Sequence, residues 1–377
     1  MAERVVVAMS GGVDSSVAAA LLREQGYDVI GVMLRLWSEP ASPVVGGAVE
    51  QAANRCCSVE AVTDAAAVAD RLGIPFYAID AEAPFKRHVV DAWIDAYAMG
   101  LTPNPCLACN RHIRFGFLLD FARSLGAACL ATGHYARVEV ADDGRFELWR
   151  GVDRSKDQSY VLSVLGQADL RQVLLPVGAY AKAQVRALAA ERGLPSATRA
   201  DSQDLCFVAD GDYRAFLSRH APQILRPGPI LDTQGRPLGA HAGLAHFTIG
   251  QRSGLGIGGG EPRYVVGLDV ARNALIVGTR DELGATTFRA GPINWVAGMP
   301  PGESFEAHVQ IRYRAPAVPA RIVLEDGLTS AVVRLQAPLR DVTPGQAAVF
   351  YRGDRCLGGG LIQRTRLKGR GEGAGAD

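Results

Sequence analysis

The heptapeptide SGGVDSS at residues 10–16 constrains the fold of this chain more than any other stretch of the sequence. It lies between an apolar, β-branched run at 4–9 and an amphipathic segment at 13–25, which predicts a buried strand, a tight turn and a helix. Paired glycines let the backbone turn so that successive N–H groups and the helix N-terminus face an anion. Ser10, Ser15 and Ser16 add hydroxyl donors, whereas Asp14 must orient the loop or meet a metal ion. Because the chain has no Gly-Lys dipeptide, this phosphate-binding turn is not a Walker A loop.

Strand-like and helix-like periodicities alternate from the N-terminus to about residue 210. Apolar runs predict strands at 4–9, 29–34, 75–79 and 127–132, and amphipathic stretches predict helices at 13–25, 59–72, 85–99 and 113–125. Strands separated by helices of this length are typical of an α/β fold, with a parallel sheet covered on both faces. Pro, Gly and small residues without periodicity predict a mobile loop at 36–55.

The chain changes character after about residue 210. From 223 onwards, short apolar runs alternate with turn signals such as RPGPI, TQGRP and EDG, and helical periodicity is almost absent. A length of 377 residues also exceeds what one ordinary core holds. We therefore expect an α/β domain at 1–210, a small β-rich domain at 211–283, a second β-rich domain at 284–366, and a disordered tail at 367–377.

Charge and hydropathy exclude several classes of protein. No stretch of about 18 apolar residues occurs and no signal peptide is recognisable, so we expect a cytoplasmic protein without a membrane helix. The net charge of +1 argues against a nucleic-acid partner. However, all but four of the 40 basic residues are Arg, and residues 284–370 hold twelve Arg or Lys against six Asp or Glu. Because Arg binds phosphate bidentately, this local excess points toward nucleic acid, unless the Arg usage reflects base composition alone.

Seven Cys residues in a large chain of this kind favour metal binding or reactive thiols over a disulfide framework. Cys106 and Cys109 lie in the segment TPNPCLACN, where two prolines precede a helix and place Cys109 near its N-terminus. The helix dipole and nearby Arg side chains lower the pKa of a thiol at such a position. Cys206 lies in DSQDLCF, at another break between periodic segments. Three thiolates could hold an iron–sulfur cluster with one open iron, or could carry out persulfide chemistry.

A series of blocks from residue 5 to about residue 363 resembles the tRNA-specific 2-thiouridylases, the MnmA family of the ATP-pyrophosphatase (PP-loop) superfamily. The blocks are SGGVDSS, CCSVE, GIPFY, TPNPCLACNRHIRFG, ATGHYARV, KDQSYVLSVL, DSQDLCFV, FTIGQRSGLGI, IRYRAPAVPA and PLRDVTPGQAAVFY with CLGGG. The first block alone indicates only the superfamily, and the others separate this family from argininosuccinate and asparagine synthetases. The resemblance implies an N-terminal PP-loop domain that binds an adenine nucleotide and a C-terminal β-barrel that contacts tRNA.

The same resemblance implies an enzyme that replaces O2 of uridine 34, the wobble base of the anticodon, by sulfur. ATP, with Mg²⁺, adenylates that oxygen and releases pyrophosphate, a protein persulfide delivers sulfur, and AMP leaves. The implied partners are the wobble-U34 tRNAs for Lys, Glu and Gln, and a cysteine desulfurase or sulfur-relay protein as the sulfur donor. Localised positive charge would then make tRNA binding sensitive to salt although the total charge is near zero.

Motif positions assign roles to individual residues. Cys109 matches the catalytic cysteine of the family and Cys206 the cysteine that carries the persulfide, and the pair is expected to form a disulfide after transfer. The residues assigned to ATP are Ala8, Met9, Ser10, Gly11, Gly12, Val13, Asp14, Ser15, Leu34 and Gly133. Those assigned to tRNA are Asn104, Pro105, Cys106, His134, Lys156, Asp157, Gln158, Arg312, Tyr313 and Gln346.

Cys106 departs from the family pattern, because many members have Asp at this position, where it is interpreted as a general acid–base or base-binding group. A thiol cannot simply inherit that role. The substitution instead creates the set Cys106, Cys109 and Cys206, which could ligate a [4Fe-4S] cluster whose free iron accepts sulfide. Persulfide transfer without a cluster is the competing hypothesis.

Two other functions compete with thiolation. An ATP-dependent ligase or amidotransferase of the same superfamily, acting on a small molecule, would leave the paired thiols and the basic C-terminal half without a role. A non-catalytic tRNA-binding protein that holds ATP as a structural ligand would bind tRNA without modifying it.

Overall fold

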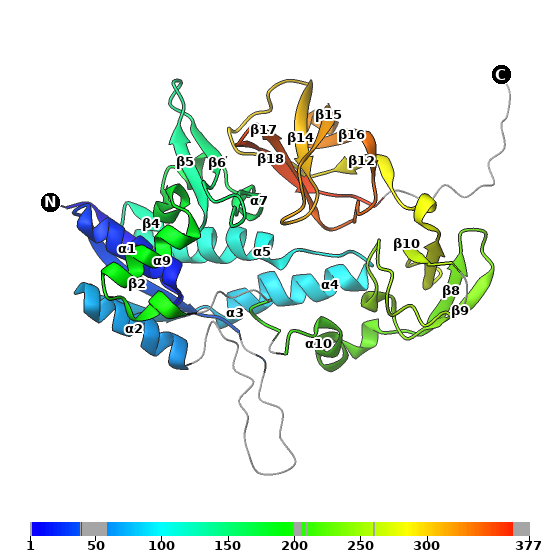
Figure 1. Cartoon of the computed structure of the whole chain (residues 1–377), viewed down its shortest axis with the longest axis horizontal. Helices are drawn as coiled ribbons and strands as arrows, with labels where there is room; N and C mark the ends of the chain where they lie inside the picture. The colour runs from blue at the N-terminus through cyan, green and yellow to red at the C-terminus, as the bar shows by residue number, and fades with distance from the viewer. Residues whose placement is uncertain are drawn as a thin grey trace, which may run out of the picture.

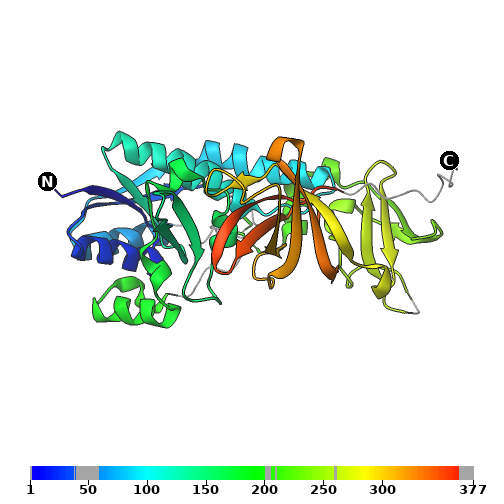
Figure 2. The same ribbon diagram turned by 90° about the horizontal axis from the view of Figure 1, so that it is seen from above.

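The computed structural model describes residues 2–37, 39, 59–199, 205–208, 210–258 and 261–364. The predicted tail at 367–377 and most of the predicted loop at 36–55 lie outside these residues. The N-terminal α/β domain lies at one end of the molecule, the central β-rich domain at the other, and the C-terminal β-barrel between them (Figure 2). No helix among the described residues has the length and apolar character that crossing a membrane requires.

A parallel five-stranded sheet forms the centre of the N-terminal domain, as the alternating periodicities predict. Its strand order is β3-β2-β1-β4-β7, and every neighbouring pair is parallel. The strands are β1 (Arg4–Ala8), β2 (Asp28–Arg35), β3 (Phe76–Asp80), β4 (Cys129–Ala131) and β7 (Val173–Leu174). The apolar run at 4–9 thus becomes the middle strand, which is the position that an uninterrupted hydrophobic strand favours.

Helices cover both faces of this sheet, because successive residues of a strand point to opposite sides. Val5 and Val7 on β1 pack in one core cluster with α1 (Val13–Glu24), α2 (Val59–Leu72) and α9 (Lys182–Glu191). Val6 packs in a second cluster with α6 (Leu118–Ser124). All three valines are fully buried, so β1 and the loop that follows it rest on a rigid base.

Two long helical segments run from the N-terminal domain toward the other domains and pass beneath the barrel (Figure 1). The first contains α3 (Glu82–Phe85), η1 (Lys86–Asp91) and α4 (Ala92–Ala98), and the second contains α5 (Pro105–Ala108), η2 (Cys109–Phe117) and α6. The second begins at Pro105, earlier than the predicted start at 113. Pro fits the first helical position, and the Asn104 side chain caps the helix by accepting a hydrogen bond from the Cys106 N–H at 3.0 Å.

The remainder of the chain forms two further sheets and short helices. The central domain has a four-stranded sheet of order β10-β11-β8-β9, and the C-terminal domain forms most of a nine-stranded sheet. The strands are β8 (Gly228–Asp232), β9 (Pro237–His241), β10 (Tyr264–Asp269), β11 (Ala274–Gly278), β12 (Ala285–Ala290), β13 (Asn294–Trp295), β14 (Ser304–Gln310), β15 (Val318–Glu325), β16 (Ser330–Leu339), β17 (Ala347–Arg352) and β18 (Arg355–Leu361). The short helices are α7 (Ser159–Leu162), α8 (Gln167–Leu170), η3 (Pro176–Ala179), η4 (Pro195–Thr198), α10 (Tyr213–His220), η5 (Pro222–Ile224), η6 (Leu244–His246), η7 (Arg280–Glu282) and η8 (Asp326–Leu328).

A hairpin from the N-terminal half joins the C-terminal sheet. Its strands are β5 (Ala136–Val140) and β6 (Phe146–Arg150), and β6 pairs with β18 through Trp149 opposite Arg355 and Leu148 opposite Cys356. The sequence analysis assigned these residues to the α/β domain alone. The shared sheet fixes the barrel relative to the loops that follow β4.

Candidate functional site

Two adjoining cavities open at the carboxyl ends of β1 and β4. Because β1 lies between β2 and β4, the chain leaves the sheet in opposite directions at this point, which is where open α/β sheets form ligand crevices. We call the cavity of about 220 Å³ the small cavity and that of about 670 Å³ the large cavity. Both are lined by Ser10, Asp14, Arg114, His134 and Gln158.

The glycine loop, residues 10–16, connects β1 to α1 at the edge of both cavities. Gly11 has a φ of +71°, and a Cβ atom there would lie 2.8 Å from the Ala61 carbonyl oxygen. The loop is closed by the Ser15 hydroxyl, which accepts from the Ser10 N–H and donates to the Gly12 carbonyl. Within the part of the chain that the structure describes, no side chain caps the α1 N-terminus, so its first N–H groups remain suited to an anion.

The residues assigned to ATP gather at these cavities. The small cavity is lined by Ala8, Met9, Ser10, Asp14, Ser15, Leu34 and Gly133, and the large cavity by Ser10, Gly12, Val13 and Asp14. Gly11 lines neither and forms the turn itself. Gly133 follows β4 and packs directly on the loop, since a Cβ atom at this position would lie 2.7 Å from the Ser15 backbone nitrogen.

Asp14 is held by two side chains that come from other parts of the chain. The Lys182 ammonium lies 2.7 and 2.8 Å from its two carboxylate oxygens, and the Tyr135 hydroxyl donates to one of them at 2.7 Å. The loop carboxylate is therefore paired with a cation from α9. The sequence analysis named neither partner.

Arg199 approaches the same loop from its other side. Its guanidinium donates to the Gly11 carbonyl at 3.2 Å and forms an ion pair with Asp64. Arg199 also lines the large cavity together with Lys182, so two cations from outside the loop flank the place where a phosphate would bind.

The three cysteines of interest lie at the same crevice, but not on one cavity wall. Cys109 is buried and Cys206 half-buried, and both line the small cavity with the glycine loop. Cys106 is exposed and lines the large cavity. Although the residue faces the cavity, the protein atoms that crowd its thiol and the nearby Cys109 raise the pKa of Cys106 to about 11, against a smaller opposite effect of Arg114.

A metal centre receives no support from this arrangement. Among the described residues, which include all three of these cysteines, no three His, Cys, Asp or Glu side chains lie close enough together to hold a metal ion. The hypothesis that Cys106, Cys109 and Cys206 ligate a [4Fe-4S] cluster would therefore require the three thiols to rearrange.

His134 follows β4 and is buried at the boundary of the two cavities. Its burial and the adjacent Arg114 hold the pKa of the imidazole well below its usual value, so the ring is neutral at pH 7. Arg114 lies 2.9 Å from Nε2 and can only donate, which leaves the proton on Nδ1, 2.7 Å from the Thr132 hydroxyl. His134 can therefore accept from Arg114 and line the site, but it is not a cation that could bind phosphate.

Most of the residues assigned to tRNA surround the large cavity. They are Asn104, Pro105, Cys106, His134, Lys156, Gln158, Tyr313 and Gln346. Arg312 lies beside it, with its guanidinium 3.7 Å from the Asp341 carboxylate. Arg314, which the sequence analysis did not name, also lines the cavity and has a left-handed φ of 64°, a conformation that is strained for a side chain of this size.

Asp157 is the exception among these residues, because its carboxylate is turned into the protein. It accepts hydrogen bonds from Arg150 at 2.7 Å, from the Ser159 hydroxyl at 2.9 Å and from the Gly151 N–H at 3.0 Å. Its side chain is only 5% exposed. This geometry favours a structural role over the tRNA contact that the resemblance assigned to Asp157.

We expect Asp157→Ala to lower the free energy of unfolding by about 3–5 kcal/mol, because it leaves the largely buried guanidinium of Arg150 without its carboxylate partner. Chemical denaturation followed by circular dichroism measures this change. Asp120→Ala, which removes a carboxylate from an exposed ion pair with Arg123, should leave the free energy of unfolding unchanged within error. A stable Asp157→Ala protein with weakened tRNA binding would contradict the structural role.

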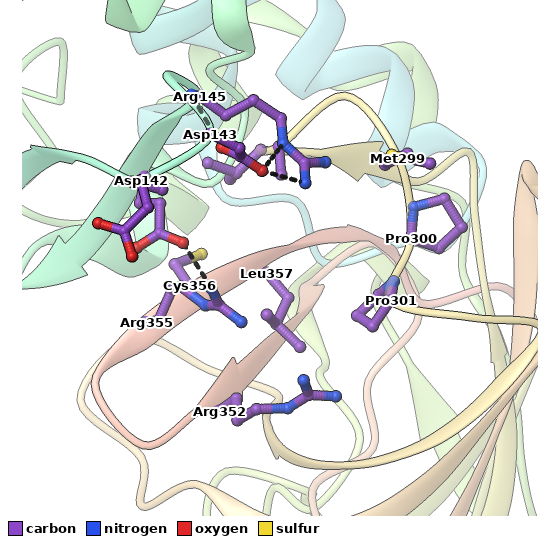
Figure 3. A pocket seen from close by; sticks show the side chains of 14 residues that line it. Asp142, Asp143, Arg145, Met299, Pro300, Pro301, Arg352, Arg355, Cys356 and Leu357 are labelled. Atoms are coloured by element: carbon purple, nitrogen blue, oxygen red, sulfur yellow. Dashed lines mark hydrogen bonds and ion pairs between the residues drawn. The ribbon is translucent and has the colours of Figure 1, made fainter.

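A further cavity, of about 570 Å³, lies between the β5–β6 hairpin and the barrel (Figure 3). Its charged side chains are largely paired with each other, Arg145 with Asp143 and Arg355 with Glu147. None of the residues assigned to ATP, tRNA or sulfur transfer lines it. The cavity is therefore separate from the candidate site.

Three family models match the chain. They are described as a tRNA methyl transferase HUP domain over residues 3–210, a tRNA methyl transferase PRC-barrel domain over 214–279 and an aminomethyltransferase β-barrel domain over 285–362. Curated relatives match nearly the whole chain. The tRNA-specific 2-thiouridylase MnmA of Chloroflexus aurantiacus is 54% identical over 364 residues, which cover 96% of this chain and 99% of that protein. The enzyme of the same name from Roseiflexus sp. is 50% identical over 379 residues, with the same coverage.

A solved structure with a more distant likeness is the U34-tRNA thiolase NcsA from Methanococcus maripaludis with its [4Fe-4S] cluster. It is 20% identical, with a TM-score of 0.32, over 58% of this chain and 68% of that chain. At this level of similarity the cluster remains a property of that protein.

Proposed function

Because the chain belongs to the MnmA family of tRNA-specific 2-thiouridylases, we propose that it replaces O2 of wobble uridine 34 in tRNA by sulfur at the expense of ATP. The observation that carries the proposal is the shared lining of the small cavity. The glycine loop, Gly133, Cys109 and Cys206 all line it, so a nucleotide bound at the loop would lie beside two thiols. A ligase or amidotransferase has no use for such thiols, and a protein that only binds tRNA needs neither group.

The nucleotide accounts for the first half of the reaction. A uracil carbonyl oxygen is a poor leaving group until it carries an adenylate, so O2 must first attack the α-phosphate of ATP and displace pyrophosphate. The small cavity combines the N-terminus of α1 for phosphate with the apolar side chains of Met33 and Leu34 for the adenine ring. Mg²⁺ bound with the ATP would neutralise phosphate charge, and Asp14 is the loop carboxylate available to it.

The thiols account for the second half. A persulfide on Cys206 attacks C2 of the activated uridine, AMP leaves, and the base is then joined to Cys206 through two sulfur atoms. The Cys109 thiolate attacks the Cys206 sulfur, which releases 2-thiouridine and leaves a Cys109–Cys206 disulfide. Both cysteines line the small cavity, which supports this assignment. An external thiol must reduce the disulfide before the next turnover.

The large cavity supports a tRNA partner. It shares five lining residues with the small cavity and is also lined by Lys156, Arg314 and Tyr313. A nucleotide inserted there would meet cations for its phosphate and a ring on which its base could stack. We propose the wobble-U34 tRNAs for Lys, Glu and Gln as substrates. A cysteine desulfurase or sulfur-relay protein of the cytoplasm would load Cys206.

An assay of 2-thiouridine formation tests the proposal. The protein is incubated with ATP, Mg²⁺, a persulfide donor and unmodified wobble-U34 tRNA, and thiolated tRNA is retarded on a mercury-containing gel. A retarded band that requires ATP, and that a tRNA with another wobble base does not give, supports the proposal. ATP binding and tRNA binding without a retarded band would leave the non-catalytic alternative.

Cys106→Ser separates persulfide transfer from cluster chemistry. A cluster held by three thiolates loses one ligand in this variant, whereas persulfide transfer needs only Cys109 and Cys206. We expect metal-free Cys106→Ser to retain thiolation within about tenfold of the wild type, short of the 100-fold or more that loss of a general acid or base costs. Iron and sulfide analysis of anaerobically purified protein runs in parallel. Stoichiometric iron in the wild type, lost with activity in the variant, would overturn this expectation.

A further inference from the structure

The glycine loop, residues 10–16, contains no Lys or Arg, and the ammonium group of Lys182 lies beside it at Asp14. Lys182 is the first residue of α9, and its side chain is only 11% exposed. Its ammonium group reaches across to Asp14 in the first turn of α1, and Lys182 lines the large cavity with Ser10 and Gly12. A carboxylate at the start of a helix occupies the kind of position that favours a bound anion. The ammonium is therefore already placed beside an anion at the phosphate end of the site.

The backbone of Lys182 is fixed relative to the loop. Its N–H donates to the Asp153 carboxylate at 2.9 Å, and α9 packs on α1 through the buried side chains of Val185 and Ala189. Because the Cα position is held while the side chain has four rotatable bonds, the ammonium can exchange one anion for another without a change in the fold.

We propose that Lys182 binds the pyrophosphate portion of ATP, in the role that the lysine of a Walker A loop has in other nucleotide-binding proteins, and that Asp14 holds its ammonium group in place when no nucleotide is bound. The inference deepens the proposed function by naming a further ATP-binding residue. Arg199 also lines the large cavity, but its guanidinium donates to the Gly11 backbone carbonyl, so its substitution would disturb the turn itself and could not isolate a contact with phosphate.

The test measures binding of three ligands by isothermal titration calorimetry, without tRNA or sulfur donor. We expect Lys182→Ala to weaken the binding of ATP and of inorganic pyrophosphate at least about tenfold, and that of adenosine within about threefold, because adenosine lacks the groups that the ammonium would contact. Lys182→Arg, which keeps the charge, should recover most of the ATP affinity. Lys86→Ala, which removes a lysine from an exposed ion pair with Asp91, is the matched control and should bind all three ligands as the wild type does.

Thermal unfolding with and without pyrophosphate guards against a variant that is merely unstable. Pyrophosphate should raise the melting temperature of the wild type and of Lys86→Ala, but not that of Lys182→Ala. Equal weakening of ATP and adenosine, or unchanged pyrophosphate binding in a folded Lys182→Ala protein, would overturn the inference and leave the proposed function intact. Wild-type protein that bound neither ATP nor pyrophosphate would overturn both.

Discussion

Replacing Cys109 or Cys206 by Ser should reduce 2-thiouridine formation at least about 1,000-fold, because a hydroxyl group can neither carry a sulfane sulfur nor release it by forming a disulfide. The affinities for ATP and tRNA should stay within about threefold, since a Ser side chain fills nearly the same volume at the wall of the small cavity. The double variant should be no less active than either single variant, because the two thiols act in one sequence of steps. The mercury-gel assay under single-turnover conditions measures the loss.

Cys129→Ser is the matched control for these variants. Cys129 is half-buried at the start of β4, in the same sheet, but it lines neither cavity. Its replacement should leave thiolation within about twofold. Peptide mapping of the wild type after one turnover without reductant should find Cys109 joined to Cys206. Thiolation by the Cys206→Ser variant at the wild-type rate would refute the assignment of the persulfide to this residue.

The sequence was sufficient for the parts of the site that depend on local pattern. The run at 5–9 is apolar without interruption, which favours its place in the middle of the sheet, and the paired glycines after it favour the turn that the structure contains. The start of the second long helix was misplaced because no apolar periodicity extends into residues 105–112. The signals that do operate there, Asn104 as a cap and Pro105 at the first position, were present in the sequence.

Residues whose role depends on tertiary contacts could not be found in this way. Lys182 reaches Asp14 only because α9 packs on α1, and Arg199 reaches Gly11 from a loop almost 190 positions later in the chain. The β5–β6 hairpin reads as part of the first domain, because nothing local shows that β18 will pair with it. Asp157 was assigned by motif position alone, and its burial, which a single sequence does not show, favours a structural role instead.

Gly133→Ala should weaken ATP binding at least about tenfold and reduce thiolation by a similar factor. The new Cβ atom would lie 2.7 Å from the Ser15 nitrogen and 2.8 Å from the Asp14 carbonyl carbon, distances that side-chain carbons do not normally reach. Both neighbours are backbone atoms of the glycine loop, so neither can rotate away and the loop itself must shift. Overpacking of this kind costs about 1–3 kcal/mol. Because the loop must move to relieve it, we expect a loss of similar size in the free energy of ATP binding.

Gly166→Ala provides the control for Gly133→Ala. It adds the same methyl group at the start of α8, where the nearest atom would be 4.0 Å away, and should therefore leave ATP binding unchanged. Calorimetric titration with ATP measures both variants, and circular dichroism confirms that each is folded. Binding of tRNA, which requires no contact with the turn at Gly11, should survive in both proteins. A folded Gly133→Ala variant with wild-type ATP affinity would contradict this prediction. It would show that ATP binding does not depend on the close packing of Gly133 against the glycine loop.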